Sequence, residues 1–222
     1  MWEIYKFYND GGWFMHPILI IAIFALATII ERIYYIMGRY NINGAEFMAQ
    51  VQKLVLANNI DRAIKLCNRA PSAALAKVVK AGLTRANRGE IEVQNAVDEA
   101  TLEVLPELQK RTNYLSVYAN VATLLGLLGT IMGLIDAFDA IDAADAAQRS
   151  SALARGISVA MNTTAFGLIV AIPAMMVHAT LQSSTIKIID EIDQYSVKLI
   201  NLLSARERRA PGAASGEEGD GT

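Results

Sequence analysis

The sequence predicts an all-α integral membrane protein whose three transmembrane helices extend into a cytoplasmic helical region. First, 53% of the 222 residues are hydrophobic and only 19% are charged, which is more apolar than a typical soluble domain. Second, residues 112–135 and 156–186 carry no charge over 24 and 31 positions, and about 20 apolar residues suffice to cross a bilayer. Third, β-branched alternation is scarce, so no sheet is expected.

The first span is expected at residues 14–37. Its apolar run ends at Glu31 and Arg32, and a basic side chain at the end of a span can reach the lipid headgroups. Tryptophan and tyrosine side chains in residues 1–13 suit the interface at the other end.

The second span, expected at 113–138, has features that a simple anchor does not need. Polar side chains recur on one helical face, and these are Ser116, Asn120, Thr123 and Thr130. Small residues near that face would let another helix approach closely, and these are Gly126, Gly129 and Gly133. The pattern predicts a helix that packs in a bundle and borders a polar space.

The third span, expected at 156–182, is also striped with polar and small residues. Ser158 and Asn162 share one face, Thr164 and Gly167 share another, and Thr163 lies between them. Pro173 would remove one backbone hydrogen bond and could bend the helix, which a packed membrane bundle tolerates.

The remaining segments read as helices and a polar tail. Residues 38–112 show helical periodicity, broken at Asn58-Asn59, at 70–72 and at 87–89, with an interruption expected near Pro106.

Aspartates recur every three residues from Asp136 to Asp145. A solvated helical turn is favoured over a metal site, because the oxygen-rich loop of a calcium site is absent. The expected order is an amino-terminal periplasmic or interfacial segment 1–13, spans at 14–37, 113–138 and 156–182, a cytoplasmic helical loop 38–112, a periplasmic loop 139–155, a cytoplasmic helix 183–209 and a disordered tail 210–222.

Loop charge predicts the orientation. Residues 38–111 carry 11 Lys and Arg and the segment after the third span carries five, whereas the 136–155 segment has two and the amino terminus one. The positive-inside rule therefore places the amino terminus outside and the carboxyl terminus in the cytoplasm.

Several function classes are disfavoured. The formal charge of −2 offers no basic excess for a nucleic acid. The single cysteine, Cys67, reads as a packing residue and cannot form a disulfide or a cysteine-based metal site within one chain. No nucleophile–base pair, phosphate loop, metal set or cofactor motif stands out, so an enzyme is not expected.

Two segments together resemble a known family. LLGLLGTIMGLI at 124–135 and TTAFGLIVAIPA at 163–174 are similar to the paired signature of the MotA/TolQ/ExbB proton-channel family, nearer its TolQ/ExbB branch. The resemblance extends over 14–203 and includes ERIYYI at 31–36.

The resemblance implies a bacterial inner-membrane, multi-pass subunit of an ion-driven motor. Members assemble as homopentamers around a single-span ExbD/TolR-like partner whose transmembrane aspartate accepts the proton, and a TonB/TolA-like envelope protein is a further implied partner. Proton flow is converted into motion that serves outer-membrane transport, envelope integrity or motility. Thr130 and Thr164 match the partner-facing threonines, Thr163 is an extra hydroxyl, and the glycines keep the wall smooth for movement.

One position departs from that pattern. The family often has a glutamate near the outer end of the third span, and Val159 stands in its place, leaving Ser158 and Asn162 as expected polar substitutes. The hypothesis is that Thr130 and Thr164 lower the cost of charging the partner's carboxylate inside a low dielectric. The alternative is a non-conducting membrane scaffold whose threonines only pack helices.

Overall fold

The computed structural model describes residues 7–8, 11–36, 42–143 and 148–209. All regular structure in these ranges is helical, and no strand occurs in them. The chain divides into two compact units, Met1–Arg32 with Arg111–Leu181 and Ile33–Lys110 with Gln182–Thr222. The expected disordered tail at 210–222 lies outside the described residues.

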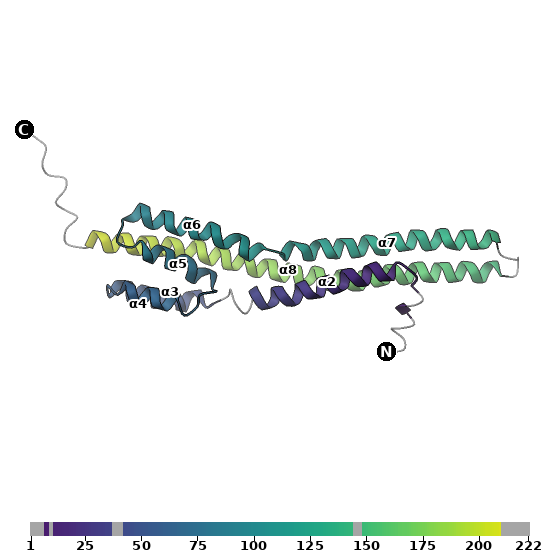
Figure 1. Ribbon diagram of the computed structural model, residues 1–222, viewed down its shortest axis with the longest axis horizontal. Helices are drawn as coiled ribbons and strands as arrows, with labels where there is room; N and C mark the ends of the chain where they lie inside the picture. Colours follow the sequence, from purple (N-terminus) through teal and green to yellow (C-terminus); the bar gives the residue numbers. More distant parts are fainter. Residues whose placement is uncertain (1–6, 9–10, 37–41, 144–147, 210–222) are drawn as a thin grey trace, which may run out of the picture. The chain divides into compact units, whose positions relative to one another are not determined.

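The first unit contains α2 (Met15–Ile33), α7 (Thr112–Ala143) and the first part of α8 (Arg149–Arg209). Figure 1 shows α2 and α7 running beside this part of α8. Within the described residues, three helical stretches are long and apolar enough to cross a membrane. Large apolar side chains cover much of their exposed surface, among them Phe24, Leu124 and Ile169, which suits helices surrounded by lipid or by other helices.

Small residues form the centre of this unit. Ala119 and Ala122 of α7 pack against Ala171 and Ala174 of α8, and Ile21 of α2 covers the cluster. Helices in lipid gain little from hydrophobic association, so close backbone approach and interhelical hydrogen bonds hold them together.

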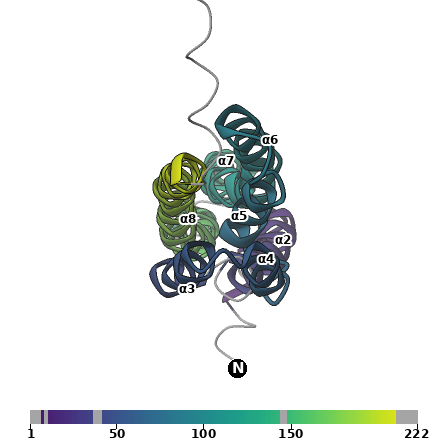
Figure 2. The same ribbon diagram turned by 90° about the vertical axis from the view of Figure 1, so that its left-hand side faces the viewer.

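The second unit is a helical bundle built from α3 (Gly44–Leu56), α4 (Ile60–Cys67), α5 (Ala74–Thr84), α6 (Glu90–Gln109) and the remainder of α8. In Figures 1 and 2, α5 lies between α4 and α6. Buried aliphatic side chains fill it, including Val51, Val78, Val97 and Leu199.

Turn chemistry explains where these helices begin and end. The side chain of Asn43 accepts a hydrogen bond from the Glu46 backbone N–H at 3.3 Å and caps α3. Asn58 follows α3 with φ 57°, and Gly89 precedes α6 with φ 96°, a backbone region that asparagine and glycine tolerate best. The three breaks predicted in this region all lie between helices.

Some boundaries differ from the sequence prediction. α6 continues through Pro106, and the chain leaves the helix at Lys110 and Arg111, where Arg111 has φ 61°. Proline removes a donor but keeps its carbonyl, and that of Pro106 accepts the Lys110 N–H at 2.9 Å. At the segment 139–155, α7 extends to Ala143 and α8 begins at Arg149, so both helices run into the predicted outer segment.

Candidate functional site

Thr130 of α7 and Thr164 of α8 meet in a reciprocal contact. Their hydroxyls contact each other. The Thr164 hydroxyl donates to the Gly126 carbonyl of α7 at 2.9 Å, and the Thr130 hydroxyl contacts the Ala160 carbonyl of α8 at 3.3 Å. Thr164 thus contacts the carbonyl that lies four residues before Thr130 on α7, and Thr130 contacts the carbonyl that lies four residues before Thr164 on α8. We call Thr130, Thr164, Gly126 and Ala160 the threonine seam.

Glycines make this approach possible. A methyl group added at Gly126 would lie 3.3 Å from the Thr164 Cα, and one added at Gly167 would lie 2.6 Å from the Ala122 carbonyl oxygen. Gly133 lies against Ala160, where an added methyl group would be 3.1 Å from the Ala160 Cβ. These glycines therefore face the α7–α8 contact within one chain.

Thr163 belongs to a different contact. Its side chain is 1% exposed, and its hydroxyl is within 3.0 Å of the Gly11 carbonyl and 2.8 Å of the Val159 carbonyl. Gly129 packs against Thr163 and Phe14. Because neighbouring helix residues point about 100° apart, Thr163 and Gly129 face the start of α2, and Thr164 and Thr130 face the other edge of the α7–α8 pair.

The other predicted polar residues do not join the seam. Ser158 is exposed and Asn162 half-buried, and the helical repeat turns both to the side of α8 away from α7. On α7, Asn120 and Thr123 are exposed, and the Thr123 hydroxyl donates to its own helix at the Ala119 carbonyl. Pro173 is exposed inside the continuous α8.

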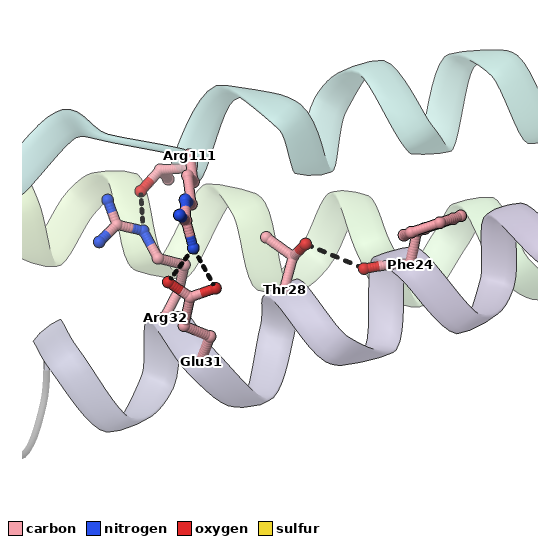
Figure 3. Close-up of polar contacts among 6 residues, drawn as sticks. Phe24, Thr28, Glu31, Arg32 and Arg111 are labelled. Atoms are coloured by element: carbon pink, nitrogen blue, oxygen red, sulfur yellow. Dashed lines mark hydrogen bonds and ion pairs between the residues drawn. The ribbon is translucent and has the colours of Figure 1, made fainter.

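The structure also shows a polar cluster that the sequence reading did not assemble. Arg111 Nη1 donates to both carboxylate oxygens of Glu31, at 2.6 and 2.9 Å, and Arg32 Nε donates to the Thr112 hydroxyl at 3.3 Å (Figure 3). Arg32 is 3% exposed. In the sequence, only the positions of these residues hint at the cluster, because Glu31 and Arg32 end the first apolar run and Arg111 precedes the second.

Neutralising this ion pair tests how firmly the end of α2 is held to the start of α7. We expect Glu31→Gln and Arg111→Gln each to destabilise the purified protein, and the double variant to lose less than the sum. The coupling should be about 0.5–1 kcal/mol, because both side chains are partly exposed. Thermal unfolding in detergent measures it, Lys110→Gln serves as the control, and additive single effects would contradict the pairing.

The single cysteine of the chain lies apart from any cluster of metal-binding side chains in the described residues. Within the described part of the chain, no group of three His, Cys, Asp or Glu side chains could hold a metal ion. Cys67 is buried, and burial raises the pKa of its thiol to about 11, although its backbone hydrogen bond and the charge of Lys80 act in the opposite direction. A thiol that stays protonated at neutral pH is a poor nucleophile.

This pKa predicts the pH dependence of alkylation. Iodoacetamide should modify native Cys67 slowly at pH 7, with a rate that rises about tenfold per pH unit towards pH 11. Since the folded-state pKa is raised, the stability linked to this thiol should be present below its unfolded pKa and lost as pH rises towards 11. Mass spectrometry of native and urea-unfolded samples measures the alkylation rates, and urea unfolding at pH 7 and at higher pH measures the stability. Equal alkylation rates for native and unfolded protein at pH 7 would refute the raised pKa of Cys67.

Comparison with known proteins agrees with this architecture. The fold is similar to a chain of the solved structure of C. jejuni MotAB, with a TM-score of 0.62, 17% sequence identity, and coverage of 85% of this chain and 75% of that chain. None of the curated proteins compared with this chain matches it significantly. A profile of the MotA/TolQ/ExbB proton channel family matches residues 70–194, a range that includes the whole threonine seam. The chain therefore belongs to the MotA/TolQ/ExbB proton channel family.

Proposed function

We propose that this protein is a stator-type subunit of an ion-driven motor in the bacterial inner membrane, of the TolQ/ExbB branch. Five copies would surround a single-span ExbD/TolR-like partner that carries an aspartate in its span. Proton flow would then perform mechanical work on the cell envelope through a TonB/TolA-like protein. The observation that carries the proposal is the threonine seam, because it places two hydroxyls together at one edge of a closely packed helix pair.

The position of the seam suits this function. Thr130 and Thr164 are half-buried in the single chain and lie on the edge of the α7–α8 pair that α2 does not cover. An uncovered polar edge inside a membrane is costly unless water or another protein meets it. A ring of identical chains could turn these edges towards a shared partner helix.

The charge distribution supports an orientation with the amino terminus outside and the carboxyl terminus in the cytoplasm. Residues 38–111, most of which belong to the second unit, carry 11 Lys and Arg. The segment that joins α7 and α8 carries far fewer, so the positive-inside rule would place the α7–α8 turn in the periplasm.

Co-expression with a single-span protein encoded next to this chain tests the proposal. We expect the two to co-purify, with five copies of this chain per complex, and to conduct protons into vesicles when a membrane potential is applied. Changing the aspartate in the partner's span to asparagine should stop the flux and leave the complex intact. A stable assembly that never conducts protons would favour the alternative, a membrane scaffold.

A further inference from the structure

Helix α6 of the second unit has an outer face that is both apolar and acidic. Its 20 residues include six Asp and Glu and no Lys or Arg. Ile91 and Leu102 are 77% and 72% exposed, and they lie in one line along the helix, because eleven residues make about three turns. We call this line, from Ile91 to Leu102, the α6 ridge.

Three carboxylates flank the α6 ridge. Asp98, Glu99 and Glu103 are exposed, and none of them forms an ion pair with another described residue. Two other carboxylates of α6 are neutralised by basic side chains of the same unit. The ridge therefore combines two exposed apolar side chains with a negative charge that is not compensated within the described part of the chain.

A groove of about 640 Å³ lies between α3 and the carboxyl-terminal part of α8, also within the second unit. Small or apolar side chains make up most of its lining, among them Ala49, Leu202 and Ala205. Leu56 lies four residues beyond Gln52, which lines the groove, and is 63% exposed. It therefore extends the apolar lining along the same face of α3.

The charge of this α3–α8 groove is positive. Lys198 lines it, and among the described residues that do so there is no Asp or Glu. Lys198 Nζ lies 5.1 Å from the centre of the Tyr195 ring. Arg206, next to the groove residue Ala205, donates to the neutral side chain of Asn58 at 2.9 Å. Neither Lys198 nor Arg206 forms an ion pair with a described carboxylate.

The ridge and the groove match in length and lie on different surfaces. The ridge spans eleven residues, about 16 Å, and the α8 side of the groove spans ten, about 15 Å. A helix that inserts apolar side chains into a groove is a common mode of recognition. Figures 1 and 2 show α6 and α3 on opposite sides of α5, and α6 does not line the groove.

We propose that the α6 ridge of one copy of this chain docks in the α3–α8 groove of the next copy, with its carboxylates facing Lys198. Complementary charges of this kind set the orientation of two partners. A contact between two different surfaces of identical chains repeats from copy to copy and closes into a ring. The inference rests on the ring of copies in the proposed function and adds the contact that joins them.

The first experiment tests the contact in membranes. Two chains with different tags are co-expressed in a Cys67→Ala background, one with Leu102→Cys on the ridge and one with Ala49→Cys in the groove. We expect a membrane-permeant bismaleimide to join the two tags, because each cysteine faces the other across the contact. Lys65→Cys, at an exposed position on α4, replaces Ala49→Cys as the control and should give no joined product.

Three results of this experiment would overturn the proposal. One is the absence of a product that joins the two tags. Another is a product that joins two Leu102→Cys chains, which would indicate a symmetric contact between ridges. The third is a product that joins Ala49→Cys to the co-purified single-span protein, which would make that protein the occupant of the groove.

The second experiment tests the opposed charges. In washed membranes, Lys198→Glu in the Ala49→Cys chain should lower the yield of joined tags about fivefold at low ionic strength, and less at high ionic strength. Glu99→Lys with Glu103→Lys in the Leu102→Cys chain should restore the yield. Lys65→Glu makes the same charge change on α4 and should have no effect.

Labelling by a monofunctional maleimide corrects the yields for changes in thiol reactivity. A corrected yield that does not respond to Lys198→Glu would overturn the charge pairing on which the docking depends.

The outcomes separate this contact from the motor function. A complex that conducts protons but gives no product between ridge and groove would overturn the contact and leave the motor function standing. A product between ridge and groove in a complex that never conducts protons would support the contact and overturn the motor function.

Discussion

Thr164→Val is expected to abolish ion-driven work while the complex still assembles. Valine is nearly isosteric with threonine but cannot donate to the Gly126 carbonyl or meet the Thr130 hydroxyl. Such bonds in membrane bundles contribute only about 0.6 kcal/mol each, so their loss should not unfold the protein. Loss of function would then reflect the missing hydroxyl itself.

The chain supplies a matched control in Thr123→Val. Thr123 is another α7 threonine, but it is exposed and donates within its own helix to the Ala119 carbonyl. Proton flux in vesicles and complementation of the envelope function in cells measure the effect, and size-exclusion chromatography checks assembly. Normal flux in Thr164→Val, or an equal loss in Thr123→Val, would refute a specific role for the seam.

Gly167→Val is expected to have the second large effect, on folding of the α7–α8 pair. The added Cβ would lie 2.6 Å from the Ala122 carbonyl oxygen and 3.2 Å from the Gly126 Cα. Both neighbours are backbone atoms and cannot turn aside as a side chain can. Overpacking of this kind typically costs about 1–3 kcal/mol, and here it also separates the two helices that form the seam.

Thermal unfolding and cysteine cross-linking between α7 and α8 measure this effect. Ala165→Val is the control, because Ala165 is an exposed position on the same helix. We expect Gly167→Val to lower the melting temperature and abolish the cross-link, and Ala165→Val to change neither. A Gly167→Val protein that is as stable as the unmodified chain would show that α7 and α8 do not approach as closely as the structure indicates.

Much of the fold was predictable because local sequence determines it. Charge-free runs of sufficient length define the apolar helices, and asparagine, proline and glycine mark the helix breaks in the second unit. An interruption was predicted near Pro106, but α6 continues to Gln109. Proline is a stronger sequence signal than Arg111, whose φ of 61° becomes visible only in the folded chain.

The site was predictable in part. Thr130 and Thr164 were expected to act together, and the structure places them in contact. The sequence does not distinguish the role of Thr163 from that of Thr164, because both carry hydroxyls at adjacent positions. Only the folded chain shows that Thr163 is on the side of α8 that faces α2, where Gly11 and Phe14 approach. The Glu31–Arg111 pair joins residues 80 positions apart, a separation over which one sequence gives no pairing signal.

By itself, the sequence determined the helical class, the three apolar stretches and the threonines worth testing, because length, apolar composition and helical repeat are local properties. Tertiary structure alone decided which helix face meets which. That choice depends on where small residues allow two backbones to approach, and it brought Thr130 to Thr164, turned Thr163 towards Gly11 and turned Ser158 and Asn162 away from α7.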